Sequence, residues 1–373
     1  MGDTVGDWIN LVHGAYPPAH AAAWDRVGLQ VGDPDWPVER VLVGLDVTRE
    51  VVAEAADGPP TLLLAHHPLL FRPLDRLTPG TAAGASALAA ARAGVAVAAA
   101  HTNLDVARDG AGTSDPVART LGLLDVEPLT SEVRASARSK LVTFVPPAAV
   151  DDVIDAISAA GAGRIGDYER CTFRVRGTGT FRAMAGADPF SGPGIGADAS
   201  EAEDRLEVEV PTDRAGAAIR ALQGAHPYEE VAYDLVALQD GATVGFGNVG
   251  RLPAPRTLAD IAASVRSDLP APHLRVAGVP ERPIERVATV GGAGDDLIGA
   301  ALGAGVDLYV TGDLRHHVTL DALEQGLALI DAGHHATEVA AMPHWIERLA
   351  ALATDVPLVA PVVASQVPTD PWR

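Results

Sequence analysis

Short apolar runs alternate with alanine-rich helical segments in both outer thirds of this chain of 373 residues, and this rhythm limits the possible folds more than any other feature. The runs cover residues 40–45, 61–65, 94–100, 286–290, 307–310 and 327–330. Valine, isoleucine and leucine dominate most of them, which is typical of strands that are buried on both faces. The alternation predicts an α/β fold with a mostly parallel sheet and helices on its faces.

The middle of the chain has a different order of elements. The pattern there predicts β-α-β-β-α-β, which is the order of a ferredoxin-like module. The predicted elements cover residues 140–145, 148–160, 171–176 with 179–183, 205–210, 213–223 and 230–238. We therefore predict an α/β domain split into residues 1–129 and 240–373, interrupted by an inserted ferredoxin-like domain at residues 130–239. Gly177 and Gly179 are interpreted as a bend or bulge in a strand of this insert.

The charge of the chain limits its partners. Its formal net charge is −21, and such a field repels phosphate backbones and anionic membrane surfaces. Arg92 and Gly94 interrupt the alanine-rich run at residues 82–100, so this run is too short for a membrane span. The first residues lack the basic and apolar regions of a signal peptide. We therefore expect a cytoplasmic protein that binds neither nucleic acid nor membranes. The lone cysteine, Cys171, excludes a disulfide framework and a cysteine-rich zinc site.

Seven of the 12 histidines fall into four motifs, and each motif directly follows an apolar run. The motifs are Ala65-His66-His67-Pro68, His101-Thr102-Asn103-Leu104-Asp105, Thr311-Gly312-Asp313-Leu314-Arg315-His316-His317 and Asp331-Ala332-Gly333-His334-His335-Ala336-Thr337-Glu338. In open α/β sheets, ligands bind beyond the carboxyl ends of the strands. The placement of four motifs at strand ends therefore predicts that they meet at one edge and form one site.

Two of these motifs indicate how side chains can bind more than one metal ion. His66 and His67 lie where a strand stops, because Pro68 cannot continue the ladder, and the turning backbone lets the two rings reach different ions. His334 and Glu338 are four residues apart at the start of a predicted helix, so both lie on one side of its first turn. The two oxygens of Glu338 can bridge two ions. Imidazole and carboxylate groups favour zinc, manganese, iron or cobalt over magnesium alone.

At these motifs the sequence resembles the Ngg-interacting-factor-like dinuclear metal-centre family, also named GTP cyclohydrolase 1 type 2. The resemblance covers nearly the whole chain and includes Trp24-Asp25-Arg26-Val27-Gly28-Leu29-Gln30-Val31-Gly32 and Leu45-Asp46-Val47-Thr48. Three insert segments resemble the long bacterial members, whose middle domain is similar to the proteins PII and CutA. These segments are Gly166-Asp167-Tyr168, Gly177-Thr178-Gly179-Thr180-Phe181 and His226-Pro227-Tyr228-Glu229-Glu230.

The resemblance implies a centre of two divalent metal ions per chain, with zinc, manganese or iron as the candidates. It implies that one ion is held by His67, Asp105 and Glu338. The second ion would be held by His66 and His334, with Glu338 shared between the two.

The resemblance also separates the remaining histidines. His101 occupies a position that lines the site, and His317 matches a family histidine. His316 and His335 stand where many members carry tyrosine, so they are left out of the ligand set. Members of this kind assemble as homohexamers, trimers of dimers with the metal sites facing an inner cavity, and we expect the same assembly here.

Two functions of different class fit these observations. The first is a metal-dependent hydrolase that acts on a small molecule; the family name makes this molecule the nucleotide GTP, attacked at C8 of guanine with release of formate. Metal ions activate water for such a step, and His101 or His317 would carry protons. The second is a metal-binding regulatory or metal-handling protein, with a PII-like sensor insert and no GTP turnover.

Two further motifs predict structural roles. Gly291-Gly292-Ala293-Gly294 lacks the third glycine of a dinucleotide fingerprint, so we interpret it as a tight turn between a strand and a helix. We interpret His226-Pro227-Tyr228-Glu229-Glu230 as a segment that forms a turn and an interface.

Overall fold

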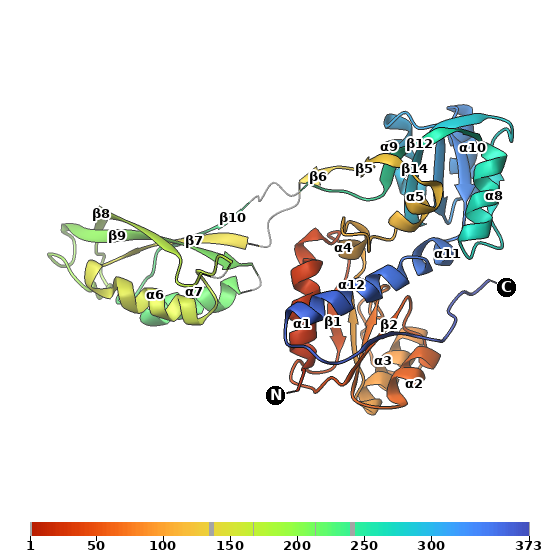
Figure 1. The fold of residues 1–373 in the computed structure, drawn as a ribbon. Coiled ribbons are helices and arrows are strands. Elements are labelled where there is room, and N and C mark those ends of the chain that lie inside the picture. The colour runs from red at the N-terminus through yellow and green to blue at the C-terminus, as the bar shows by residue number, and fades with distance from the viewer. Residues whose placement is uncertain (1, 134–137, 167, 213, 239–242, 373) are drawn as a thin grey trace. The chain divides into compact units, whose positions relative to one another are not determined.

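The computed structural model describes residues 2–133, 138–166, 168–212, 214–238 and 243–372. The chain forms two compact units (Figure 1). Residues 1–132 and 243–373 make up the first unit, and residues 133–242 make up the second. Asp167, the predicted helix start at Asp213 and the predicted boundary at Gln239 lie outside the described residues. No helix in the described part of the chain has the length and apolar character that crossing a membrane requires.

The first unit contains two large sheets, whereas the sequence predicts one. The five-stranded sheet has the order β1-β4-β3-β2-β17, and every pair except β1 with β4 is parallel. Its strands are β1 (Gly28–Val31), β2 (Arg40–Gly44), β3 (Thr61–Ala65), β4 (Ala96–Ala99) and β17 (Val362–Ala364). Because β17 comes from the far end of the chain, both ends of the sequence build this sheet.

The second sheet of this unit is only partly parallel. Its order is β13-β16-β15-β14-β12-β5, and only the three neighbours β14, β15 and β16 run parallel. Its strands are β5 (Leu124–Pro128), β12 (Asn248–Thr257), β13 (Arg275–Ala277), β14 (Pro283–Ala293), β15 (Leu308–Gly312) and β16 (Ala328–Asp331). The prediction of a mostly parallel sheet is therefore wrong for this half. The flanking strands β5, β12 and β13 are short or polar, so they lack the apolar runs that mark buried strands.

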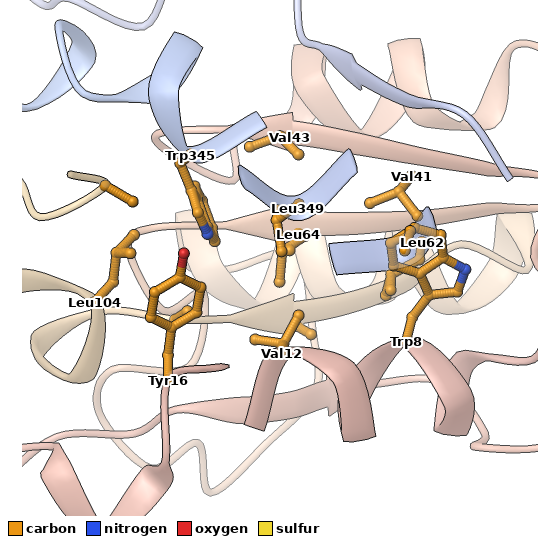
Figure 2. Packing of buried hydrophobic residues seen from close by; sticks show 14 of the residues in the cluster. Trp8, Val12, Tyr16, Val41, Val43, Leu62, Leu64, Leu104, Trp345 and Leu349 are labelled. Carbon is orange, nitrogen blue, oxygen red and sulfur yellow. The ribbon is translucent and has the colours of Figure 1, made fainter. Parts of the chain in front are cut away.

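Helices cover both faces of the five-stranded sheet. On one face, α1 (Val5–Ala15) and α12 (Met342–Asp355) enclose a core that includes Trp8, Leu64 and Trp345 (Figure 2). On the other face, α2 (Arg49–Ala56) and α3 (Ala82–Ala93) pack against it. A capping box between Thr4 and Asp7 begins α1. The C-terminal helix α12 thus belongs to the core of the N-terminal sheet.

The second sheet carries the remaining helices of this unit. They are α5 (Asp115–Leu121), α8 (Leu258–Asp268), α9 (Ile298–Gly303), α10 (His316–Glu324) and α11 (His334–Val339). Short helical turns complete the connections, namely η1 (Pro18–His20), α4 (Thr102–Asp105) and η3 (Asp295–Leu297). The two-residue strands β6 (Glu132–Val133) and β11 (Thr243–Val244) pair with each other.

The second unit has a single antiparallel sheet with the order β10-β7-β9-β8. Two helices pack on one face of this sheet, around Leu141, Ile157 and Leu206 (Figure 1). The elements are β7 (Arg138–Val145), η2 (Pro147–Ala149), α6 (Val150–Ala159), β8 (Thr172–Arg182), β9 (Asp198–Pro211), α7 (Ala215–Ala225) and β10 (Tyr233–Ala237). Their order along the chain is β-α-β-β-α-β.

Strand β8 runs without a break through Gly177 and Gly179. Its pairing with β9 keeps one register from Thr172 with Val208 to Arg182 with Asp198. The predicted bend or bulge at the two glycines is therefore wrong. Glycine is often placed in strands where another group approaches the backbone closely, and the side chain of Glu203 approaches Gly179 in this way.

Candidate metal centre

Six of the seven predicted site residues converge beyond the ends of three strands. His66 and His67 follow β3, and their backbone N–H groups donate to the carbonyls of Gly44 and Leu45, which extends the parallel ladder. The other four come from the helical turn after β4 and from the helix after β16: His101, Asp105, His334 and Glu338. The site thus lies where strand ends of two different sheets meet.

Each of the four histidines directs Nδ1 toward an oxygen outside the cluster. The contacts are His66 Nδ1 to the Ala100 carbonyl at 3.0 Å, His67 Nδ1 to Asp46 Oδ1 at 2.8 Å, His101 Nδ1 to Asp25 Oδ1 at 2.8 Å and His334 Nδ1 to Asp313 Oδ2 at 2.7 Å. Carbonyl and carboxylate oxygens accept hydrogen bonds, so Nδ1 carries the proton in each ring. The Nε2 lone pairs are consequently left for the interior of the cluster.

The Nε2 atoms point at each other and at two carboxylates. His67 Nε2 and His334 Nε2 lie 3.3 Å apart, and each is 3.1 Å from Glu338 Oε2. His66 Nε2 lies 3.5 Å from Asp105 Oδ1 and 3.6 Å from Glu338 Oε1. These separations bring several lone pairs together, which is unfavourable unless protons or a cation lie between them.

Two buried atoms of the cluster have no hydrogen-bond partner: His66 Nε2 and Glu338 Oε2. His66 is 0% exposed and Glu338 is 3% exposed. The contacts of Glu338 Oε2 at 3.1 Å face ring nitrogens whose protons are on the opposite side, so distance alone does not make them hydrogen bonds. Buried polar groups are normally satisfied. The donor set and its unsatisfied atoms fit a divalent cation of the kind that imidazole and carboxylate bind.

The same crowding shifts the pKa values of the cluster. Burial lowers the pKa of His67, but the carboxylates of Asp46 and Glu338 outweigh burial and raise it to about 10. Burial also lowers the pKa of His334, whereas Glu338 and Asp313 raise it to about 9. Burial of Glu338 favours its neutral form, yet contacts with His334, His66 and His67 hold its pKa well below the ordinary value. The site therefore favours positive charge at its centre.

Three aspartates beyond the predicted set of site residues orient its histidines. Asp46, Asp25 and Asp313 accept the Nδ1 protons of His67, His101 and His334. Such partners fix the ring and its tautomer in metal sites. Asp46 lies two residues after the end of β2, close to where the histidine motifs follow their strands, and that position is a signal that sequence reasoning could have used. Asp25 precedes β1 and follows no strand, so its only signal in the sequence is its place in residues 24–32, which carry the family resemblance.

Asp25 makes the most extensive of these contacts. Besides His101, it accepts hydrogen bonds from the backbone N–H and the hydroxyl of Thr102. Burial favours the neutral carboxyl, but these donors outweigh it and hold the pKa of Asp25 well below its ordinary range. Asp25 is therefore an anionic anchor for the turn that carries His101.

Among the residues that the structure describes, two groups of side chains could each hold a metal ion. One group is His66, His67 and His101, and the other is His67, His334 and Glu338. Asp105 belongs to neither group, although its Oδ1 lies near His66 Nε2 and accepts a hydrogen bond from the Thr113 hydroxyl at 2.6 Å. The geometry thus gives His101 a ligand-like position as well as the lining position that the resemblance implies.

His317 lies apart from this cluster. It is exposed on α10, and its ring contact is with the neighbouring His316, at 5.2 Å between ring centroids. His335 turns toward Asp370, with 3.8 Å between Nδ1 and Oδ2. The described contacts of His317 and His335 are therefore with residues outside the cluster.

The glycine motif supports the site, but the prediction of a tight turn is wrong for most of it, because Gly291, Gly292 and Ala293 are the last residues of β14. Gly292 has φ +70°, and a Cβ atom there would lie 2.2 Å from Glu338 Oε1. Its N–H donates to the hydroxyl of Thr337 at 2.9 Å, which holds the end of β14 against α11. Only glycine combines this backbone conformation with such close approach. The motif therefore brings the backbone against the carboxylate that the cluster needs.

A pocket of about 540 Å³ opens beside the cluster, and His67, His101 and Glu338 line it. Two large aromatic side chains stand at this pocket: Trp24 is 57% exposed and Phe71 is 43% exposed. Their ring centroids lie 5.8 Å apart, and both are near His101, at 6.1 Å and 6.2 Å. The pocket therefore combines polar groups at its base with apolar ring surfaces beside them.

The fold and site define a mixed α/β protein with several sheets and a histidine–carboxylate cluster that could bind metal. The model of the Duf34/NIF3 (NGG1p interacting factor 3) family matches residues 4–371. The chain belongs to this family.

Relatives and solved structures agree with that membership. A GTP cyclohydrolase 1 type 2 homolog of Halalkalibacterium halodurans is 40% identical over 373 residues, which is 100% of this chain and 98% of the relative. A homolog with the same name from Bacillus subtilis is 37% identical, over 98% of this chain and 96% of the relative. The crystal structure of a Bacillus cereus protein related to NIF3 matches with a TM-score of 0.69 and 37% identity, covering 100% of this chain and 99% of that one.

Proposed function

We propose that this protein is a dinuclear metal-dependent hydrolase. The observation that carries the proposal is the convergence of Nε2 lone pairs from His66, His67 and His334 on the buried carboxylate of Glu338, with every Nδ1 proton directed outward. A cluster that served only to stabilise the fold would satisfy its buried atoms internally.

In this proposal, five residues hold two divalent ions: His66, His67, Asp105, His334 and Glu338. When bound, such ions make coordinated water acidic near neutral pH and stabilise negative charge on an attacked centre. Asp46 and Asp313 keep His67 and His334 in the tautomer that offers Nε2. The buried Glu338 would be shared between the two ions.

We assign the proton-carrying role to His101 rather than to His317. His101 is fixed at Nδ1 by the anionic Asp25 and lines the same pocket as Glu338. An imidazole with one nitrogen anchored can accept a proton at the other nitrogen and return it, as general acid–base catalysis requires. His317 is exposed and has no described contact with the cluster.

For the substrate we propose a nucleotide, with GTP as the first candidate because relatives are named GTP cyclohydrolase 1 type 2 homologs. One water added at C8 of guanine opens the five-membered ring and leaves a formyl group on nitrogen, and a second water hydrolyses that formamide to release formate. The pocket supports a flat substrate, since a heterocyclic ring can pack against the exposed faces of Trp24 or Phe71 while its edge reaches toward His101.

The proposal is tested by formate release and metal content measured together. Protein loaded with zinc, manganese or iron should release formate from GTP, and about two ions per chain should fall to one or none in Glu338→Ala. Glu347→Ala is the matched control, because the Glu347 side chain is 78% exposed on α12. An unchanged ion count in Glu338→Ala would contradict the bridging role proposed for Glu338. If no formate is released from GTP at any pH or with any of these metals, GTP is excluded as the substrate.

The inserted domain supports a second, regulatory candidate. We propose that it is a ferredoxin-like domain of the PII and CutA kind, on the basis of its β-α-β-β-α-β order and its strand order β10-β7-β9-β8. If the insert only senses a ligand, a chain without residues 133–242 should keep its metal content and basal turnover. The predicted homohexamer is tested by the native mass of the full chain.

A further inference from the structure

The inserted domain contains a pocket of about 340 Å³ that the proposed hydrolase does not use. Strands β7, β8 and β9 supply one side of it, and loop 183–191 together with segment 228–232 supplies the other. Two of these lining regions belong to motifs for which the sequence predicts structural roles, namely the glycines of β8 and the segment after α7. Their convergence on one cavity indicates a shared role.

The centre of the pocket is the carboxylate of Glu203 on β9. The hydroxyl of Tyr228 donates to Glu203 Oε1 at 2.8 Å. A Cβ atom on Gly179 would lie 2.0 Å from Glu203 Oε2, so the carboxylate occupies space that only glycine leaves free. This contact explains why β8 carries a glycine at a position where the strand neither bends nor bulges.

The loop that closes the pocket is held at its middle, Asp188, and at its first residue, Ala183. The backbone N–H of Asp188 donates to Glu229 Oε1 at 2.8 Å, and the N–H of Gly196 donates to the carbonyl of Ala183 at 2.8 Å. Gly192, with φ +107°, packs close to the ring of Phe181. The ring of Phe190 then lies 5.9 Å from that of Tyr228, between their centroids. The pocket is therefore preformed by specific contacts.

The pocket combines aromatic faces with negative charge. Three carboxylates line it, those of Glu203, Glu229 and Glu230, and none of its lining residues within the described part of the insert is lysine, arginine or histidine. The nearby Arg205 stacks on Phe144 at 5.7 Å but is paired with Glu207 at 2.9 Å. Aromatic faces next to an acidic group attract organic cations, and this pairing recognises ammonium ligands in aromatic cages.

We propose that this pocket binds a small organic cation, with its ammonium or guanidinium head at Glu203 and its apolar part against Phe190 and Tyr228. The volume suits a small ligand and is too small for a folded partner. The site is independent of the metal centre, because all of its residues belong to the second compact unit.

The test measures binding of small probes to the full chain by ligand-observed saturation-transfer NMR at physiological salt. The probes are choline, agmatine and 3,3-dimethylbutan-1-ol, which has the shape of choline without its charge. At least one cation should bind, and the neutral isostere should bind about tenfold more weakly or not at all. Glu203→Gln should weaken cation binding by about tenfold, because it removes the charge while keeping an acceptor for Tyr228.

Controls separate this site from general attraction by an acidic protein. Glu169→Gln removes one exposed charge from the same unit outside the pocket, and binding should be unchanged. Tyr228→Phe keeps the ring face and removes the hydroxyl. Because the proposal places the ligand against the ring face, this variant should retain most of the affinity for the cation. Equal binding by Glu203→Gln and the parent chain, or equal binding of the neutral isostere, would overturn the proposal. So would failure of both cations to bind at millimolar concentration.

Discussion

His67 and His334 are 267 residues apart in the sequence, and their Nε2 atoms lie 3.3 Å apart at the meeting of two sheets. Each ring donates its Nδ1 proton to an aspartate on the outer side. Two imidazole lone pairs that face each other at this distance repel unless a proton or a cation lies between them. A divalent ion meets that requirement with the ligand types present.

The aspartates behind the rings should tune metal binding without touching the metal. Asp46→Ala removes the acceptor of the His67 Nδ1 proton, so the ring loses its fixed tautomer. Loss of such a partner costs about 10- to 100-fold in metal affinity. Competition with a chelator at constant pH measures this. Asp75→Ala, at an exposed position, should leave the affinity at the parent value.

Gly292 should be intolerant of any side chain. Gly292→Ala places a methyl group where Glu338 Oε1 lies and imposes a positive φ on alanine. A strained backbone of this kind costs about 1 to 3 kcal/mol, and we expect a lower melting temperature together with reduced metal content. Gly299→Ala in α9 is the matched control, because a Cβ there meets no atom within 4 Å. Equal melting temperatures for the two variants would contradict the close approach of Glu338 to Gly292.

Trp24 should act on substrate binding and not on the metal centre. Trp24→Ala removes a ring face beside His101 and is expected to raise KM for the nucleotide by about tenfold, with metal content unchanged. Steady-state kinetics and metal analysis of the same preparation measure both quantities. Leu124→Ala, which removes an exposed apolar side chain from β5, should change neither. A loss of metal in Trp24→Ala would instead indicate a structural role.

The stability of the inserted domain should depend on pH through His226. Its Nε2–H donates to the carbonyl of Phe144 at 3.0 Å, and its Nδ1 accepts from the N–H of Tyr228 at 3.1 Å. Burial lowers the pKa of His226 below the ordinary 6.5, although the Phe144 carbonyl and Glu203 act in the opposite direction. The folded domain therefore takes up this proton less readily than the unfolded chain, so its free energy of unfolding is full above pH 6.5 and falls as pH decreases below it.

Hydrogen exchange of insert peptides at about pH 7.5 and about pH 5, corrected for intrinsic rates, tests this dependence. Protection should be lower at the acidic pH in the parent chain. His226→Gln should reduce the difference, whereas His273→Gln, at an exposed position in the other unit, should preserve it. The same pH response in His226→Gln would assign the effect to another group.

Much of the site could be predicted from the sequence because its signals are local. His66, His101 and His334 each come after an apolar strand, and a parallel strand delivers the residues after it to the carboxyl edge of its sheet. The helical spacing of His334 and Glu338 placed both on one side of α11. By contrast, the separation of the outer thirds into two sheets was missed, since β12 and β5 pair as polar antiparallel strands with no apolar run to mark them.

The sequence by itself determined the strand and helix rhythm of the parallel segments, the donor chemistry of the centre and the family. Tertiary structure alone decided that His317 is exposed with its ring against His316, that Asp25, Asp46 and Asp313 hold the rings, and that Gly179 makes room for Glu203. The reason is physical. Strand ends and helical turns arise from local backbone preferences, whereas the partner of a ring nitrogen or of a missing Cβ comes from segments that only packing brings together.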